Sequence, residues 1–312
     1  MDRWNLIKRT RDLLSKAGFY VSKPHNVRSI SFDMVARRDS TLLIIKVLQN
    51  ADALSHDNAE EMKLLAEVLE GAPLVIAEKS SSGSIEPGVI YSRMGIPILS
   101  YETLEEYLKE GEPPLIFAAP GGFYTRINGE LLAKVRKEWG ISLGELASVA
   151  GVSRKAIQMY EEGMSAEVNV ALALEEYLQI PLIEPLDPFV YTPKERVELE
   201  RFDLIDEFDR KVMEFLDSMG YHVFPTMRCP FDALTERERE VLLTNIGEYS
   251  RSLARKAEIV REVSDIAEQE AVIFLRHEVR RTELKGVPII TLDELRNSSF
   301  EDLLNLIRER KK

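Results

Sequence analysis

The chain has 312 residues, of which 45% are hydrophobic and 30% are charged. This length excludes a single small domain and predicts two or three domains, each with a packed core. The formal net charge is −12, which excludes a protein that binds nucleic acid through its overall charge, so any contact with DNA has to be local.

Cysteine content and hydropathy further limit the class of protein to which the chain can belong. Cys229 is the single cysteine, so the chain forms no internal disulfide and has no cysteine set for zinc. The four histidines are scattered without the spacing of a zinc site. No stretch approaches the ~20 consecutive apolar residues of a membrane span. We therefore expect a cytoplasmic protein with no membrane contact, no bound metal and no cofactor.

Residues 1–114 have the pattern of an α/β domain. A helix that ends near Gly18 comes first and is followed by a strand. Continuous runs of Val, Ile and Leu later in this region indicate a sheet that is covered on both faces. The later predicted elements are a strand at 42–47, a helix at 58–69, a strand at 74–77 and a strand at 95–100.

The order helix, strand with Phe-Asp, turn, apolar strand ending in Lys, then helix resembles the PD-(D/E)xK nuclease fold. That resemblance implies that Asp33 is the first metal-binding acid and Lys46 the lysine of the site. The second acid position holds Ile44, which cannot bind Mg²⁺. We therefore expect a degenerate, non-catalytic domain in which Asp33 caps a turn or pairs with an arginine. A buried Lys46 needs a partner, such as Asp33.

Residues 131–163 predict two short helices joined by a tight turn. Ser142 stands before the first helix, where its side-chain oxygen can cap free amides. Gly151 ends that helix at a position suited to a positive backbone φ. The inward face of the first helix is predicted from three-, four- and seven-residue spacing, and it consists of Leu143, Leu146, Ala147 and Ala150.

A second helix is expected over residues 153–161, with Ser153 as its cap and with Ile157 and Tyr160 facing inward. Arginine and lysine can contact guanine edges or phosphates, and glutamine can pair with adenine. The outward face of this helix therefore has the chemistry of a major-groove reader. Its three long polar side chains are Arg154, Lys155 and Gln158.

From about residue 129 to residue 182 the sequence resembles the Cro/C1-type helix-turn-helix domain, also called XRE or lambda-repressor-like. The resemblance implies that the helix beginning at Ser153 is the recognition helix and that the partner is double-stranded DNA. Leu143 departs from the family, which usually places a polar residue that contacts the DNA backbone there. The candidate DNA-binding residues are Ser153, Arg154, Lys155, Gln158, Ser142 and, on a short strand expected at 121–127, Arg126.

The region after residue 200 repeats the N-terminal pattern in the same order. Asp232 matches Asp33, but Leu243 and Asn245 stand where the acid and the lysine would be. This region therefore resembles a second degenerate nuclease-like domain. The matching segments are 14–21 with 216–223, 31–35 with 230–234, 42–47 with 241–246, 58–69 with 252–266, 74–77 with 272–275, and 95–100 with 286–291.

The predicted fold class is α/β multidomain, with two related restriction-endonuclease-like α/β domains flanking an all-α lambda-repressor-like domain. The expected boundaries are 1–114, 119–190 and 200–312. Proline-rich pieces at 112–114 with 119–120, and at 181–193, are interpreted as linkers.

This layout resembles the archaeal family of HTH-type transcriptional regulatory proteins over nearly the full chain. The resemblance implies a sequence-specific DNA-binding regulator without enzymatic activity. We expect a homodimer, because one helix-turn-helix reads only a few base pairs and a two-fold pair multiplies selectivity. The sequence identifies no small-molecule effector.

Two other functions remain open at this point. One is a structure-specific, metal-dependent DNA nuclease that uses Asp33 and Lys46, with a further acid such as Asp39 or Glu61. The other is a non-enzymatic scaffold whose helix-turn-helix binds protein, since a fold does not by itself fix a function.

Overall fold

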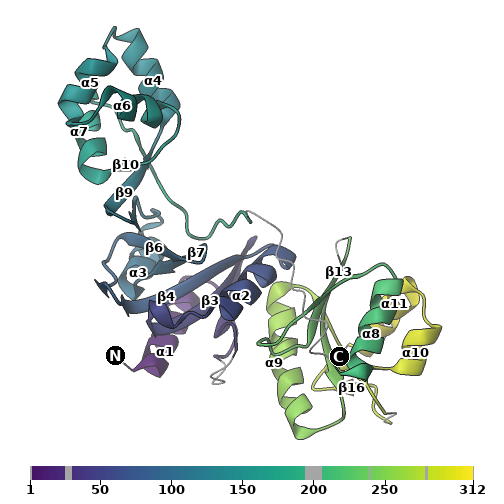
Figure 1. Ribbon diagram of the computed structural model, residues 1–312. Coiled ribbons are helices and arrows are strands. Elements are labelled where there is room, and N and C mark those ends of the chain that lie inside the picture. The colour runs from purple at the N-terminus through teal and green to yellow at the C-terminus, as the bar shows by residue number, and fades with distance from the viewer. Residues whose placement is uncertain (1, 25–29, 194–205, 239, 278–279, 312) are drawn as a thin grey trace. The chain divides into compact units, whose positions relative to one another are not determined.

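The computed structural model describes residues 2–24, 30–193, 206–238, 240–277 and 280–311 (Figure 1). Within these ranges, no helix combines the length and the apolar character that crossing a membrane requires. The chain divides into two compact units. The first unit comprises Met1–Val47, Leu54–Leu74 and Phe189–Lys312, and the second comprises Leu48–Ala53 and Val75–Pro188.

The N-terminal part of the first unit is built around a long apolar strand, β3. Seven successive residues of β3 are buried, because helices and neighbouring strands cover them on both sides. Hydrogen bonds join the strands in the order β1-β2-β3, and β2 and β3 are antiparallel. The elements are α1 (Arg3–Lys16), β1 (Tyr20–Val21), β2 (Met34–Arg38), β3 (Thr41–Asn50, which runs on into the second unit) and α2 (His56–Val68).

The C-terminal part of the first unit repeats this plan in the predicted order. Its strands are joined in the order β12-β13-β14-β15-β17-β16, and β14, β15 and β17 are parallel. α9 lies on one face of this sheet and α8, α10 and α11 lie on the other (Figure 1), which confirms the two-faced burial predicted from the apolar runs. The elements are α8 (Glu207–Ser218), β12 (His222–Pro225), β13 (Ala233–Arg237), β14 (Glu240–Gly247), α9 (Arg251–Ala267), β15 (Glu270–Leu275), β16 (Glu283–Leu284), β17 (Val287–Thr291), α10 (Leu292–Asn297) and α11 (Phe300–Arg310).

The second unit joins a small sheet to a helical domain. Hydrogen bonds connect β4-β7-β6-β8-β9-β10, while β5 pairs with β4 and β11 pairs with β9. β9 leads directly into four helices, α4 to α7 (Figure 1). The elements are β4 (Ala72–Ser80, which begins in the first unit), β5 (Gly83–Ser84), β6 (Val89–Arg93), β7 (Ile96–Leu99), α3 (Tyr101–Glu110), β8 (Ile116–Ala119), β9 (Gly122–Ile127), α4 (Gly129–Glu138), α5 (Leu143–Ala150), α6 (Arg154–Glu161), β10 (Ala166–Glu167), α7 (Val168–Leu178) and β11 (Ile183–Glu184).

The linker interpretation of the proline-rich pieces is wrong for 119–120, whereas the segment 181–193 contains the boundary between the two units, at Pro188 and Phe189. Ala119 pairs with Gly122 across the β8–β9 hairpin, so Pro120 lies at the hairpin tip, where its missing N–H leaves no ladder bond unmade. Ile183 pairs with Ile127 in β9, and the Leu186 amide donates to a carbonyl of the same unit. Strand pairing therefore holds residues 119–120 and 183–184 within the second unit. The domain boundaries 1–114, 119–190 and 200–312 stay predictions.

Candidate nucleic-acid interface

The helix-turn-helix rests on one apolar core. Leu146 of α5, Ile157 of α6 and Leu174 of α7 are fully buried in the same cluster. The predicted inward residues Leu143 and Ala150 are partly buried against it. Leu143 thus replaces the polar residue of the Cro/C1 pattern with a side chain that packs inward.

Both predicted helix caps are present. The hydroxyl oxygen of Ser142 accepts the Glu145 amide at 3.1 Å, and that of Ser153 accepts the Ala156 amide at 3.1 Å. Gly151 ends α5 in the left-handed conformation with φ of 66°. These local contacts fix where α5 stops and α6 starts. Ser142 and Ser153 are exposed at the first turns of α5 and α6, and their contact with DNA stays a prediction.

An ion pair that sequence reasoning missed holds α6 against α4. The guanidinium of Arg136 in α4 makes a two-pronged contact with Glu161 at the end of α6, with Nη2 and Oε2 2.8 Å apart. Its hydrogen bond to Glu161 raises the pKa of Arg136. The side chains are 14% and 11% exposed, so water screens the pair only partly. The residues are 25 positions apart, and no local pattern signals this pairing.

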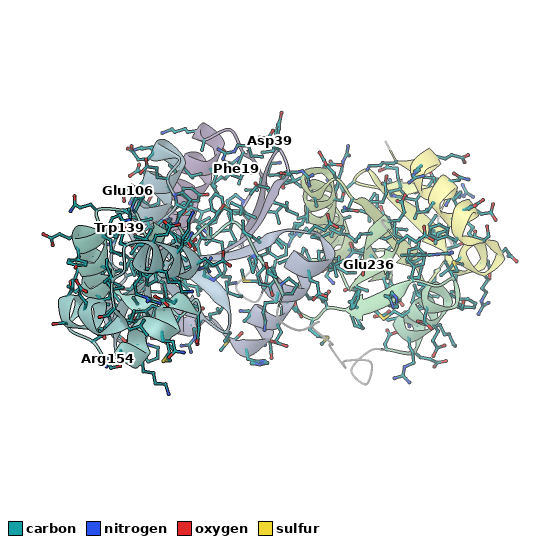
Figure 2. The ribbon with its side chains drawn as sticks, turned by 90° about the horizontal axis from the view of Figure 1, so that it is seen from above. Phe19, Asp39, Glu106, Trp139, Arg154 and Glu236 are labelled. Carbon is teal, nitrogen blue, oxygen red and sulfur yellow. The ribbon has the colours of Figure 1, made fainter. Side chains whose placement is uncertain are left out.

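The three predicted contact residues lie on the solvent side of α6. Arg154, Lys155 and Gln158 are exposed, opposite the buried Ile157 and Tyr160. Gln158 donates to Glu162 across one helical turn. Within the described part of the chain, no carboxylate forms an ion pair with Arg154 or Lys155. Figure 2 shows Arg154 at the outer edge of the helical domain.

Arg126 does not belong to this α6 face. It is exposed on β9, and its backbone lies opposite Glu184 of β11. A carboxylate on the neighbouring strand lowers the local positive potential. Arg126 therefore stays a separate, predicted phosphate contact.

The first nuclease-like site is closed by a cation from its own chain. Asp33 is fully buried, with Oδ1 2.5 Å from Nη2 of Arg3, and its Oδ2 accepts the Val47 amide at 2.8 Å. Lys46 is 3% exposed and donates to the carbonyl of Ile30. Burial lowers the pKa of Lys46, and the nearby Asp33 opposes that shift. The expected arginine partner of Asp33 is confirmed, whereas the hydrogen bond of Lys46 goes to a carbonyl rather than to Asp33.

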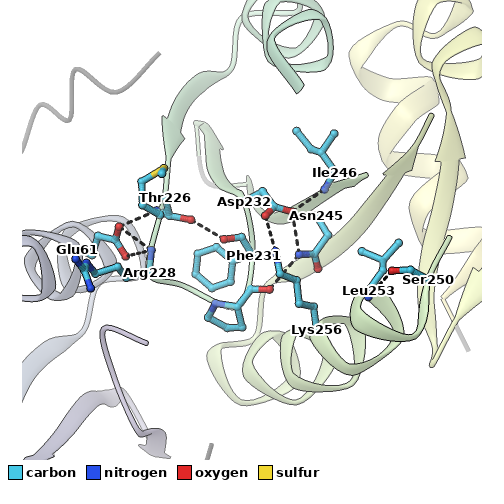
Figure 3. A network of polar contacts seen from close by, with 12 residues as sticks. Glu61, Thr226, Arg228, Phe231, Asp232, Asn245, Ile246, Ser250, Leu253 and Lys256 are labelled. Carbon is cyan, nitrogen blue, oxygen red and sulfur yellow. Dashed lines mark hydrogen bonds and ion pairs between the residues drawn. The ribbon is translucent and has the colours of Figure 1, made fainter. Parts of the chain in front are cut away.

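The second nuclease-like site uses the same arrangement (Figure 3). Oδ2 of Asp232 accepts the Ile246 amide at 2.9 Å, and Oδ1 lies 2.8 Å from Nζ of Lys256. The Asn245 amide group donates to Asp232 and to the carbonyl of Pro230. In each copy a strand amide holds one carboxylate oxygen and an ammonium or guanidinium holds the other.

Asp39 and Glu61, the further acids considered for a nuclease, do not lie in a metal site with Asp33. Asp39 is exposed in the turn between β2 and β3, at the opposite end of β2 from Asp33. Glu61 is fully buried in α2, and its carboxylate accepts the backbone amides of Met227 and Arg228 at 2.8 to 3.0 Å (Figure 3). Searched over the described ranges, the chain brings no three His, Cys, Asp or Glu side chains into a metal-binding group.

The Glu61 contacts join the two halves of the first unit. Arg228 also donates to Asp57, and its carbonyl accepts the Ser31 amide at 2.7 Å. The thiol of Cys229 lies 3.2 Å from Glu61, and burial together with this carboxylate raises the pKa of the thiol. Glu61 and Arg228 are 167 residues apart, so sequence reasoning had no signal for this network.

Comparison with known proteins assigns the N-terminal region and the helix-turn-helix to families. The PD-(D/E)XK superfamily domain matches residues 3–114, and a helix-turn-helix family matches residues 132–184. A protein of Methanocaldococcus jannaschii, named "Putative HTH-type transcriptional regulatory protein", is 39% identical over 97% of this chain and 94% of its own length. Proteins of the same name from Methanococcoides burtonii and Halorubrum lacusprofundi are 37% and 36% identical, with 97% and 98% of their lengths covered. No solved structure matches the chain.

The buried Glu61 network yields a stability prediction. Glu61→Gln leaves one oxygen to accept the Met227 and Arg228 amides but turns an amide donor toward the Arg228 amide and the Cys229 thiol. We expect the free energy of unfolding in urea to fall by about 2–3 kcal/mol, because a charged acceptor of buried amides is lost. Glu60→Gln is the control, since Glu60 makes partly exposed ion pairs on the same helix. Equal effects of the two substitutions would contradict the role of Glu61.

Asp209 yields a pH prediction. Burial and the carboxylates of Asp206 and Asp232 raise its pKa to about 6. The folded state therefore binds more protons than the unfolded chain between pH ~4 and ~6, so this group makes stability fall as pH rises through that window. Asp209→Asn should raise the free energy of unfolding by about 1–2 kcal/mol near pH 7.5 and change it little near pH 4. Glu214→Gln, exposed on the same helix, should show no such pH dependence.

Proposed function

Because the chain belongs to the archaeal family of HTH-type transcriptional regulatory proteins, we propose that it is a sequence-specific DNA-binding regulator that places α6 in the major groove. The observation that carries this proposal is the exposed donor face of α6. Ile157 and Tyr160 anchor the helix from behind, and the Arg136–Glu161 pair fixes its end. A reading helix needs this rigidity, because base edges are recognised by hydrogen bonds of defined direction.

The net negative charge of the chain supports DNA binding through a few local contacts. The chain carries 53 acidic and 41 basic residues, so its overall field repels a phosphate backbone. Non-specific affinity for DNA comes almost entirely from such electrostatics and is therefore weak here. The proposed regulator depends on a few contacts made by α6, and its preference for the right sequence over bulk DNA gains from the acidic remainder.

We propose that the DNA-bound form is a homodimer. A single recognition helix reads only a few base pairs, whereas two copies related by a two-fold axis read half-sites about one helical turn apart. Closed two-fold dimers are also the commonest homo-oligomers. The site selected by such a dimer would be an inverted repeat.

The two nuclease-like regions are proposed to be structural rather than catalytic. Ile44 and Leu243 are fully buried at the positions of the second acid, and neither can bind a hard cation. Asp33 and Asp232 are already held by Arg3 and Lys256. A metal ion would have to compete with Arg3 and Lys256 for the carboxylate oxygens that these two side chains already contact.

Selection of bound sequences from a random DNA pool tests the proposal. The full-length protein is expected to enrich one inverted-repeat motif. Gln158→Ala should then relax the preference at one position in each half-site by about 1–3 kcal/mol, because a bidentate contact to a base is lost. Lys134→Ala, an exposed change on α4, is the control and should leave the motif intact. Recovery of no common motif would refute the regulator.

A further inference from the structure

The guanidinium of Arg154 lies directly on the backbone of Gly144. A Cβ built on Gly144 would come within 2.9 Å of Nε and 3.1 Å of Nη2 of Arg154. A methyl group at this position would displace the guanidinium from where it lies, so this packing of Arg154 depends on the glycine. Gly144 is in the first turn of α5 and has no positive φ. Its backbone gives no reason for glycine there, and glycine is a poor helix former.

This packing places the guanidinium of Arg154 beside the first turn of α5. Arg154 is the first residue of α6, and its side chain reaches across to the start of α5. Lys155 and Gln158 remain exposed on α6 itself. In a helix-turn-helix bound to DNA, the first of the two helices crosses the phosphate backbone while the second lies in the groove. A guanidinium held on α5 therefore faces phosphates rather than base edges.

The charge of Arg154 is available for such a contact. Among the residues whose placement is described, none forms an ion pair with it. A guanidinium binds phosphate through two parallel hydrogen bonds, and here it lies beside the first turn of α5 next to Gly144. The neighbouring Leu143 packs into the core and offers no polar group to the backbone.

We infer that Arg154 is a phosphate contact, that Gly144 is the residue that positions it, and that sequence reading falls to Lys155 and Gln158. This assignment rests on the proposed function and divides the α6 face into two roles. Arg154 supplies affinity for any duplex, and the other two residues supply selectivity.

The experiment measures binding of the full-length protein to the selected duplex and to an unrelated duplex of equal length over a series of salt concentrations. Arg154→Ala should weaken both by the same factor, about tenfold near 0.1 M salt, and lower the slope of log K against log salt by about one. Gly144→Ala should act in the same direction without lowering the melting temperature, because alanine favours the helix. Arg154→Lys should retain the salt slope.

A double variant separates positioning from a general effect of the helix. In the Arg154→Ala background, Gly144→Ala should cause no further loss of affinity, because its effect acts through the guanidinium. The inference would be overturned if Arg154→Ala changed the preferred base at one position and left the affinity for the unrelated duplex unchanged. That outcome would not affect the proposed function as a DNA-binding regulator. If the wild-type protein binds neither duplex, the proposed function fails, and the inference fails with it.

Discussion

A carboxylate that is wholly or largely removed from water needs hydrogen-bond donors and cations around it, and this constraint organises both α/β parts of the chain. In both Asp33 and Asp232, one carboxylate oxygen accepts a strand amide, from β3 and β14 respectively. The other oxygen contacts a cationic side chain. Removing Arg3 would leave the fully buried Asp33 without its cation, at a cost of about 3–5 kcal/mol, whereas the Asp232–Lys256 pair is partly exposed and screened by water. The carboxylate that would bind a metal in a nuclease thus joins β3 to α1 in the first copy and β14 to α9 in the second.

Because the carboxylates of Asp33 and Asp232 already contact cations, the polar side chains that we propose for partner binding are those of α6 in the second unit. The exposed donors of α6 stand on a small helical domain whose core, caps and Arg136–Glu161 pair leave that helix little freedom. Immobilised side chains lose less entropy when they bind. The long-range contacts of Glu61 stabilise the first unit independently of this interface.

Features set by neighbouring residues could be predicted from the sequence. The caps at Ser142 and Ser153 and the Gly151 terminus depend on a few adjacent residues, and the repeated order of strands and helices follows from internal similarity. Features set by tertiary packing could not. Proline at 120 signals a turn but not whether it belongs to a linker or to a hairpin. The Arg3–Asp33, Arg136–Glu161 and Glu61–Arg228 contacts join residues that are 30, 25 and 167 positions apart. The packing of Arg154 on Gly144 also needs the crossing of two helices.

In the proposed complex, α6 reads DNA from the major groove as one half of a two-fold pair. Dimethyl sulfate interference mapping tests it most directly, because methylation at guanine N7 blocks contacts in that groove. We expect two short clusters of interfering guanines whose centres lie about 10 base pairs apart, one for each copy of α6. Binding that is indifferent to N7 methylation, or a single cluster without a symmetry mate, would contradict it.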